Sequence, residues 1–243
     1  MLKSQRQKVI VERLQREGAV RVTELAQALE VDPVTVRRDL AALERRGQLR
    51  RVHGGAVVRE GDGPPSRATG QAGRIAEAAA KFIPDEGVLF LGPGALTAEV
   101  VPFLRAHQQL TVITNALDAA WSLARHHPHP LHVLGGQVGA DYGLYGDPEA
   151  LQRLRADVIV LAADGLDAER GLTQDDREAA TFTRTLFGLS AEIIVLLDPE
   201  RLGRTGALFV APASEIDVLV TGRAANNALL WDLSELGIRI VLA

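Results

Sequence analysis

The stretch VLFLGPGALTAEVV, residues 88–101, places a glycine-rich turn between an apolar run and a helical pattern. Backbone N–H groups at such a turn meet the N-terminus of the following helix, where they bind phosphate and other anions. Sites of this kind commonly add Ser or Thr hydroxyls or a Lys side chain, but Ala95 and Leu96 follow the turn here. The stretch therefore fits an anion site, a dinucleotide site, or a loop of that shape whose ligand has changed.

Residues 71–243 alternate apolar runs typical of strands with helical patterns. Near-continuous apolar strands separated by amphipathic helices predict a mainly parallel sheet that is covered on both faces. We expect strands at residues 88–92, 110–114, 131–135, 157–163, 192–198, 216–222 and 238–243. Ligands bind beyond the carboxyl ends of such strands. The residues at these ends are therefore candidates for binding a ligand: Gly92, Gly94, Asn115, Gly135, Gly136 and Asp164.

Several acidic residues near these ends are candidates for acid–base catalysis by an isomerase-like enzyme: Asp164, Asp167, Asp175, Asp176 and Glu178. Such catalysis also needs a cation for the developing oxyanion, and the chain has no lysine beyond Lys81. A cap on the helix that follows explains Asp175 or Asp176 more simply. We therefore expect a protein that is not an enzyme, with an isomerase as the alternative.

The same glycine turn partly matches the G-x-G-x-x-G pattern of dinucleotide sites, since Gly92 and Gly94 follow a strand. Thr97 takes the position of the third small residue. The next strand end, ITNA at residues 113–116, lacks the acidic residue that binds ribose. A dinucleotide-sensing domain is therefore a second alternative.

Four histidines lie in and beside a short segment, HHPHPLH: His126, His127, His129 and His132. Paired histidines bind zinc, but two prolines make this segment a loop, and no Asp, Glu or Cys stands beside it. We interpret it as a solvated loop and expect neither a metal nor a cofactor. Trp121 and Trp231 lie on apolar helix faces, which predicts core or interface positions.

Charge divides the chain into a basic head and an acidic remainder. Residues 1–60 hold 13 Lys and Arg against 8 Asp and Glu, whereas residues 61–243 hold 14 against 23. A basic segment in a chain of net charge −4 indicates a part that meets a polyanion such as nucleic acid. A Gly- and Pro-rich segment follows it, so we predict a head at 1–58, a linker at 59–70 and a larger domain at 71–243.

Three helical patterns occupy the head. The first covers residues 4–16 and turns Val9, Ile10 and Leu14 inward. The second begins with Thr23 as its N-cap, and the third begins with Asp32 as its N-cap. A helix, a short turn and a second helix form a helix-turn-helix.

The third helix has one face for a core and one for DNA. Val36, Leu40 and Leu43 share the first face, which leaves the opposite face for a major groove. QLRRVHGGAVV, residues 48–58, alternates like a strand, turns and returns, which predicts a wing. Arg binds guanine or phosphate, and Thr binds phosphate or touches a thymine methyl. The candidate DNA contacts are Thr35, Arg37, Arg38, Arg45, Arg51 and His53.

TVRRDL at residues 35–40 and RRVHGGA at residues 50–56 resemble the N-terminal signature of the DeoR family of bacterial transcriptional regulators. LGPGALT, VITNA, HVLGG and VLLDPERLG follow the C-terminal domain of that family. The resemblance implies an α/β protein, in which an N-terminal winged helix-turn-helix joins a larger, mainly parallel domain similar to ribose-5-phosphate isomerase. It also implies a regulator of carbohydrate or related metabolic genes, most often a repressor. Its partners would be operator DNA and a sugar-phosphate-like effector.

The chain departs from the family pattern where phosphate is expected to bind. The family's first loop carries an acidic residue and two hydroxyls that are absent here, and Thr97 is the nearest hydroxyl. Arg201 stands where the family has a lysine. Each lost bond costs about 1–3 kcal/mol of affinity. Thr97 and Arg201 complete the candidate effector-binding set, and we expect ordinary sugar phosphates to bind weakly.

Composition limits where the protein works. Cysteine is absent, which excludes disulfides and thiolate metal sites. No signal-peptide core and no apolar stretch long enough for a membrane span are found, so we expect a cytoplasmic protein with no membrane partner. Helix-turn-helix proteins bind paired half-sites, so we also expect a homo-oligomer held by the acidic domain.

Overall fold

A computed structural model of the chain describes residues 3–17, 19–29, 31–45, 49–52, 55–57, 70–147, 151 and 153–243. The chain divides into two compact units, Met1–Ser66 and Arg67–Ala243. One apolar core lies in the first unit, and two lie in the second.

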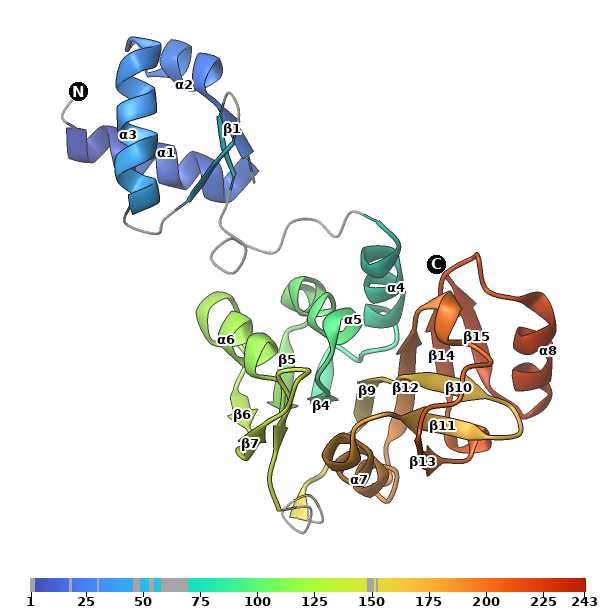
Figure 1. The fold of residues 1–243 in the computed structure, drawn as a ribbon. Helices are drawn as coiled ribbons and strands as arrows, with labels where there is room; N and C mark the ends of the chain where they lie inside the picture. The colour runs from blue at the N-terminus through green and yellow to red at the C-terminus, as the bar shows by residue number, and fades with distance from the viewer. Residues whose placement is uncertain are drawn as a thin grey trace. The chain divides into compact units, whose positions relative to one another are not determined.

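The first unit packs three helices against a small antiparallel sheet of order β1-β3-β2 (Figure 1). Its elements are α1 (Lys3–Glu17), β1 (Ala19–Arg21), α2 (Val22–Ala28), α3 (Pro33–Arg45), β2 (Arg50–Val52) and β3 (Gly55–Val57). Val36, Leu40 and Leu43 are buried, as the helical pattern of α3 predicts. The three predicted helices and the strand pair of the predicted wing are therefore confirmed.

Two details of this unit differ from the sequence prediction. Val9 is 39% exposed, because the buried stripe of α1 runs through Ile10 and Leu14. Thr23 does not cap α2, since the helix already includes Val22 and its N-cap residue forms no side-chain bond. Val22 is buried, and burying a Val side chain contributes more than the roughly 1 kcal/mol of a capping bond.

Gly55 allows the strands of the first unit to approach closely. A Cβ atom at this position would lie 2.1 Å from the carbonyl oxygen of Val20 in β1. Any other residue would push β3 away from β1. Gly54, expected in the turn between β2 and β3, lies outside the described residues.

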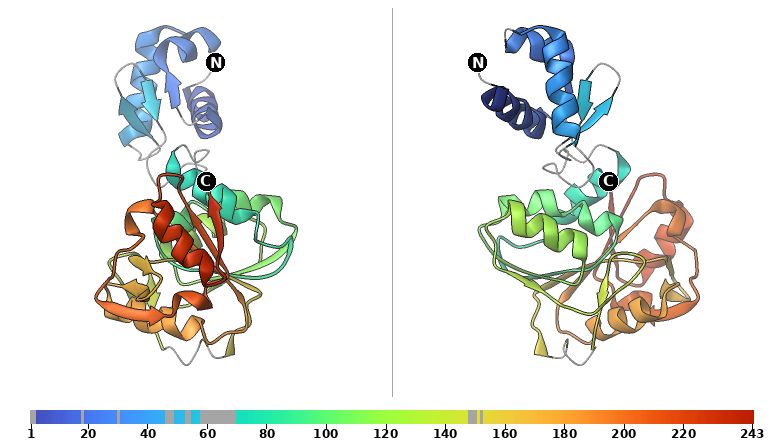
Figure 2. Two further views of the ribbon diagram at one scale, coloured as in Figure 1. Left: turned by 90° about the vertical axis from the view of Figure 1, so that its right-hand side faces the viewer. Right: turned by 60° about the vertical axis from the view of Figure 1, so that its left-hand side comes forward.

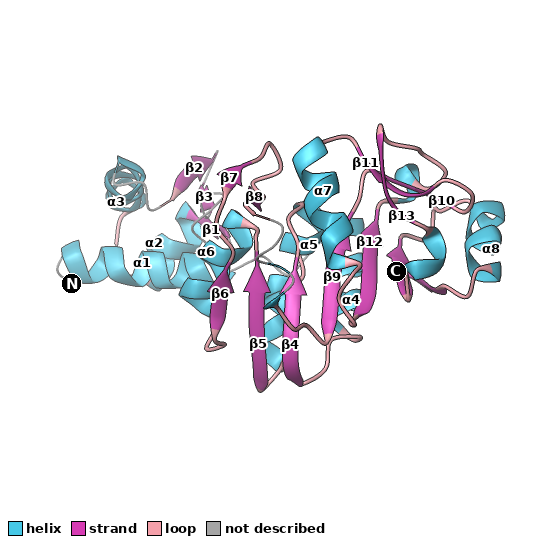
Figure 3. Ribbon diagram, turned by 90° about the horizontal axis from the view of Figure 1, so that it is seen from below, coloured by secondary structure: helices cyan, strands magenta, loops and turns pink. Residues whose placement is uncertain are grey.

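The second unit is built on a seven-stranded sheet of order β15-β14-β12-β9-β4-β5-β6, in which every neighbouring pair is parallel. Its strands are β4 (Glu86–Leu91), β5 (Gln109–Thr114), β6 (Leu131–Val133), β9 (Val158–Ala162), β12 (Glu192–Leu197), β14 (Val218–Thr221) and β15 (Arg239–Leu242). All seven predicted strands are confirmed. Figure 3 shows β6, β5, β4, β9 and β12 side by side.

Alternate side chains of each strand enter two separate cores. In β12, Ile193 and Val195 belong to one core, whereas Ile194 belongs to the other. The core of Ile194 is completed by α4 (Gln71–Ala80), α5 (Ala95–Ala98), η1 (Val101–Ala106) and α6 (Leu117–His126). The core of Ile193 is completed by α7 (Arg177–Leu186) and α8 (Asn227–Glu235). Figure 2 shows α6, in green, and α8, in red, at opposite ends of the sheet.

The sequence prediction missed several short antiparallel strands. β10 (Gly165–Asp167), β11 (Gly171–Gln174) and β13 (Leu208–Ala211) form one sheet, and β7 (Gln137–Val138) pairs with β8 (Leu144–Tyr145). Strands of two to four residues are too short to show a period. The helical pattern that follows the glycine turn also does not form one continuous helix. Pro102 lacks an N–H group, and the segment divides into α5 and the 3₁₀-helix η1.

Some apolar side chains stay outside these cores. Trp121 is 58% exposed and Trp231 is 66% exposed, so the core interpretation of both is wrong. The interface interpretation stays a prediction. Within the described ranges, no helix combines the length and the apolar character that crossing a membrane requires.

A buried ion pair joins α1 to α3. The Asp39 carboxylate accepts hydrogen bonds from Arg6 Nε at 2.5 Å and from Gln7 Nε2 at 3.0 Å. The Asp39 side chain is 3% exposed and the Arg6 side chain 12% exposed. Asp39 lies between Val36 and Leu40 on the inward face of α3, so it anchors that helix from its core side.

We expect Asp39→Ala to destabilise the first unit by about 3 kcal/mol, because Arg6 would keep a buried charge without this partner. Both tryptophans lie in the second unit. The circular dichroism transition of the helices should therefore move to lower denaturant while the tryptophan fluorescence midpoint stays unchanged. Glu44→Ala is the control, since the exposed pair that Glu44 forms with Arg51 contributes at most about 1 kcal/mol. Equal shifts in the two variants would contradict the prediction.

Candidate functional sites

The turn between α2 and α3 fixes the start of α3. Asp32 accepts a hydrogen bond from the backbone N–H of Val34 through Oδ1 at 2.7 Å, as predicted for an N-cap. Pro33 takes the first helical position, where its missing N–H costs nothing. The N–H of Val31 donates to the carbonyl of Ala26 at 3.1 Å, which closes the turn after α2.

The outward face of α3 carries the predicted DNA contacts. Arg37 and Arg38 are exposed, Thr35 is half-buried, and Val34 is 50% exposed. An apolar residue and two guanidinium groups on one helix face suit a major groove, where base edges and phosphates lie close together. The side chain of Arg45 lies outside the described part of the structure.

Arg51 in β2 is tied to α3. Its backbone N–H donates to Glu44 Oε1 at 2.9 Å, and its Nη1 lies 3.8 Å from Glu44 Oε2. Both side chains are exposed, so a phosphate can compete with Glu44 for the guanidinium. His53, the other wing residue predicted to contact DNA, is not among the described residues.

The sheet order brings the predicted effector residues to one edge of the second unit. Strands β12, β9, β4, β5 and β6 are consecutive neighbours and run in the same direction. The loops that follow them therefore leave the sheet on the same side. These loops carry Gly92, Gly94, Thr97, Asn115, Gly135, Gly136, Asp164 and Arg201.

The glycine turn after β4 offers little to a phosphate. The N–H of Gly92 donates to the carbonyl of Val160 at 2.9 Å, so it belongs to the sheet. Gly94 has φ +128°, a left-handed conformation that favours glycine. Thr97 is buried, and its hydroxyl donates to the Gly94 carbonyl at 2.8 Å. Because α5 has four residues, its dipole is small, and this turn is a weak anion site.

The loops after β5 and β6 pack against β8. The buried Asn115 side chain donates from Nδ2 to the backbone carbonyl of Leu144 at 3.3 Å. The backbone carbonyl of Asn115 accepts a hydrogen bond from the N–H of Leu144 at 2.6 Å. A Cβ atom on Gly136 would lie 2.2 Å from the carbonyl carbon of Tyr145, so this position needs glycine for packing. Gly135 is exposed with open space around it. Asn115 Oδ1 is buried and has no hydrogen-bond partner in the described part of the chain.

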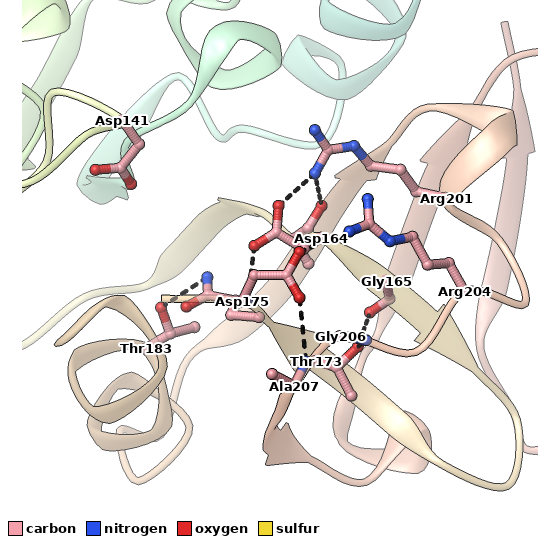
Figure 4. A network of polar contacts seen from close by, with 12 residues as sticks. Asp141, Asp164, Gly165, Thr173, Asp175, Thr183, Arg201, Arg204, Gly206 and Ala207 are labelled. Atoms are coloured by element: carbon pink, nitrogen blue, oxygen red, sulfur yellow. Dashed lines mark hydrogen bonds and ion pairs between the residues drawn. The ribbon is translucent and has the colours of Figure 1, made fainter. Parts of the chain in front are cut away.

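Asp164 and Arg201 neutralise each other. Arg201 Nη1 lies 2.6 Å from Asp164 Oδ1 and also donates to the carbonyl of Ala163 at 3.0 Å (Figure 4). Asp164 Oδ2 accepts the N–H of Asp175 at 2.9 Å. Arg201 ends the 3₁₀-helix η3 (Pro199–Arg201) after β12. A ligand anion that reaches Arg201 must therefore compete with a carboxylate.

A second ion pair, which the sequence analysis did not identify, extends this network. Arg204 Nη2 lies 2.6 Å from Asp175 Oδ2, and Asp175 Oδ1 accepts the N–H of Ala207 at 3.1 Å. The N-cap of α7 is Asp176, whose side chain accepts hydrogen bonds from the N–H groups of Glu178 and Ala179. The expectation that Asp175 or Asp176 caps this helix is confirmed for Asp176.

Tyr145 and Asp141 are two further residues near the strand ends that the sequence did not identify as candidates. The Tyr145 hydroxyl donates to Asp141 Oδ2 at 2.5 Å. Burial raises the pKa of Tyr145, and the bond to Asp141 and the charges of Asp141, Asp176 and Asp164 raise it further. Tyr145 also borders a cavity of about 300 Å³ with Gly146, Arg177, Glu178, Thr181 and Phe182. Among the described residues, the strand-end region therefore brings Asp141, Asp164 and Asp175 together with two arginines that are already paired, Arg201 and Arg204.

The histidine segment is partly packed. Both ring nitrogens of His127 are buried and have no hydrogen-bond partner among the described residues. His129 Nε2 lies 2.8 Å from the carbonyl oxygen of Leu104. A solvated loop is therefore wrong for His127. Across the described ranges, no three His, Cys, Asp or Glu side chains are grouped so that they could hold a metal ion.

Comparisons with known proteins match both units. The family model of the DeoR C-terminal sensor domain matches residues 69–223, and that of the DeoR-like helix-turn-helix domain matches residues 6–61.

Two curated relatives match along nearly their full length. A putative aga operon transcriptional repressor from Escherichia coli is 28% identical over 251 residues, which span 98% of this chain and 93% of the relative. The glycerol-3-phosphate regulon repressor of Haemophilus influenzae is 28% identical over 256 residues, which span 100% of this chain and 98% of the relative. Among solved structures, ribose 5-phosphate isomerase A from Methanocaldococcus jannaschii aligns with a TM-score of 0.40 and 19% identity over 53% of this chain and 52% of that one.

Acid should weaken the second unit through His127. Burial, followed by the charges of Arg105, His129 and His126, lowers the pKa of His127 from its ordinary 6.5 to about 4. In the unfolded chain the His127 imidazole is therefore protonated below about pH 6.5, whereas in the folded chain it is protonated only below about pH 4. The stabilisation is complete above pH 6.5 and is lost as the pH falls toward 4.

We expect the free energy of unfolding, followed by tryptophan fluorescence, to fall by about 1 kcal/mol more between pH 7.5 and pH 5 in the wild type than in His127→Phe. This figure allows for solvent around the half-buried ring. His132→Phe is the control, because the His132 side chain is exposed. The same pH dependence in wild type and His127→Phe would contradict this assignment.

Proposed function

This chain belongs to the DeoR family of effector-controlled, DNA-binding transcriptional regulators, and we propose that it represses genes of carbohydrate or related metabolism. The observation that carries the proposal is the outward face of α3. Arg37 and Arg38 are exposed there, and neither forms an ion pair within the part of the chain that the structure describes. A helix presented in this way by a buried core and a fixed turn is ready to enter a groove.

For the DNA interface we propose Thr35, Arg37, Arg38, Arg45, Arg51 and His53. The two arginines of α3 would read base edges or hold phosphates from the major groove. Arg51 and His53 would meet the backbone or the minor groove from the wing. The exposed Arg51–Glu44 pair supports this role, because the guanidinium is held in place without being buried.

For the sensor site we propose a small metabolite at the strand ends of the second unit. Its contacts would come from Gly92, Gly94, Thr97, Asn115, Gly135, Gly136, Asp164 and Arg201. Two features favour a ligand that is held mainly through its hydroxyl groups and only loosely through a phosphate. Arg201 is already paired with Asp164. The buried Oδ1 of Asn115 is a hydrogen-bond acceptor that has no donor among the described residues.

The boundaries that we propose are a DNA-binding domain at residues 1–58, a linker at 59–70 and a sensor domain at 71–243. The division of the chain between Ser66 and Arg67 supports this assignment. The start of the sensor-family match at residue 69 supports it too. We further propose a homo-oligomer, since a helix-turn-helix needs two copies to bind two half-sites.

Catalysis and dinucleotide binding are less favoured. An isomerase needs a carboxylate that can take a proton, but Asp164 is bound to Arg201 and Asp175 to Arg204. A dinucleotide needs a helix N-terminus behind its glycine turn, and α5 has four residues. We therefore propose a regulator without enzymatic activity.

Replacing either arginine of α3 should weaken operator binding. We expect Arg37→Ala and Arg38→Ala each to lower affinity for the operator by about 10- to 100-fold, since each bidentate base contact contributes about 1–3 kcal/mol. A mobility-shift assay at fixed salt against operator and scrambled DNA measures this loss. Arg170→Ala, which removes an exposed arginine of the sensor unit, is the charge-matched control. Undiminished operator binding by both α3 variants would refute the assignment.

The ion pair between Asp164 and Arg201 should limit phosphate binding. We expect glycerol 3-phosphate and ribose 5-phosphate to bind with dissociation constants above about 100 µM. Asp164→Asn releases Arg201 and should tighten binding of either phosphate about tenfold, whereas Asp167→Asn should not. Titration calorimetry measures both constants. Micromolar binding by the wild type, or no gain in Asp164→Asn, would contradict this model of the site.

A further inference from the structure

Helix α6 presents an apolar stripe to solvent. Leu117 is 45% exposed and Trp121 is 58% exposed, and they lie one helical turn apart. Ala124 and Arg125 continue the same face and are also exposed. The opposite face of α6 is buried through residues such as Leu123. A large aromatic side chain in the middle of an exposed helix face is typical of an interface anchor.

A strained turn extends this stripe. Tyr142 is 63% exposed and has φ 61°. No other residue except glycine has a positive φ in the described part of the chain. The carbonyl of Tyr142 accepts the N–H of Leu117 at 3.0 Å, which fixes the turn beside the start of α6. A left-handed conformation costs about 1 kcal/mol or more. The exposed Tyr142 side chain is therefore held by a backbone conformation that is unfavourable in itself.

The charges on this face are complementary to themselves. Asp118 lies in the first turn of α6 and Arg125 in the last, and both are exposed. If two α6 helices lie antiparallel about a two-fold axis near residues 121 and 122, each Asp118 faces the Arg125 of the other copy. The two Trp121 side chains then lie between the two ion pairs. Asp and Arg at these ends also suit the helix dipole. Within the chain, the Arg125 guanidinium carbon lies 5.4 Å from the centroid of the Trp121 ring. Trp121 is nevertheless 58% exposed, so most of this side chain remains available to a partner.

We propose that the α6 face, defined as Leu117, Asp118, Trp121, Ala124, Arg125 and Tyr142, is the surface through which the sensor unit binds a second copy of this chain. The proposal rests on the proposed function in one respect, because paired half-sites require a two-fold contact. A two-fold contact is isologous, so each patch must complement itself, as this one does.

The other exposed tryptophan lacks this property. Trp231 lies on α8, whose exposed face carries Asp232 and Glu235, and α8 has no basic residue. Two copies of that face would bring carboxylates together without a compensating cation. Trp231 therefore provides a matched control for Trp121: the same residue type, similar exposure and a helix of similar length.

The first experiment compares Trp121→Glu with Trp231→Glu in the full chain by sedimentation velocity. We expect the wild type and Trp231→Glu to form dimers or larger assemblies, and Trp121→Glu to raise the dissociation constant by about 30-fold or more. Thermal unfolding confirms that each variant is folded. A monomeric wild type would overturn the proposal, as would dissociation caused by Trp231→Glu and not by Trp121→Glu.

The second experiment tests the antiparallel pairing itself. Asp118→Arg and Arg125→Asp should each weaken self-association, because each places two like-charged pairs at the contact. An equimolar mixture of the two variants should associate again, since every pair in the mixed dimer is then of opposite charge. If mixing restores nothing, α6 does not pair with α6, and the proposal is wrong.

DNA binding separates this proposal from the proposed function. The dissociated Trp121→Glu variant should keep its affinity for a single half-site and lose the cooperative gain on a paired site. A wild type that self-associates through α6 but binds no DNA sequence preferentially would refute the regulatory function and leave the interface standing. A wild type that binds the operator but remains monomeric would refute the α6 interface and leave the regulatory function standing.

Discussion

The parallel direction of all seven strands is the constraint on which the sensor unit depends. Because each strand must return to the same end before the next begins, helices or long loops must cross the sheet, and they cover both of its faces. The strands are consequently buried on both sides and contribute to two cores. Every loop that follows a strand leaves the sheet at one edge. Residues as distant in sequence as Gly92 and Arg201 lie at the same edge because of this direction.

At that edge two arginines form ion pairs with aspartates of the same chain. Arg201 holds Asp164, and Arg204 holds Asp175. Both pairs are partly exposed, so each contributes little to stability. Their larger effect is on binding, because a carboxylate at 2.6 Å lowers the potential that an incoming anion meets at the guanidinium. A neutral polyol meets no such competition and finds carboxylate oxygens as acceptors. For the proposed sensor site, we therefore expect selectivity for ligands whose atoms can share these pairs rather than break them.

The sequence was sufficient for the features that repeat or that depend on neighbouring residues. Strands buried on both faces, such as β9 and β12, are apolar throughout and stand out at once. Asp32 and Asp176 cap their helices through bonds to residues two or three positions away. The partners of Asp39, Arg201 and Arg204 could not be predicted in this way. They lie 29 to 38 residues away along the chain and become neighbours only after the layers pack. The exposure of Trp121 could not be predicted from the sequence either, since the helical pattern of α6 does not show whether another element covers this side chain.

The turn of residues 139–143 shows why such long-range contacts matter. Its N–H and carbonyl groups bond within the turn, to Asp141 Oδ1 and to the N–H of Leu117, so it has little freedom to shift by itself. Asp141 bonds Tyr145 beside the strand ends, while the next residue, Tyr142, stands at the exposed start of α6. One peptide bond therefore separates a carboxylate of the strand-end region from an aromatic ring at the surface. A ligand can change the state of the protein only by binding two arrangements unequally. Asp141 links Tyr145 to the start of α6 through one peptide bond and through the hydrogen bond between the Tyr142 carbonyl and the N–H of Leu117.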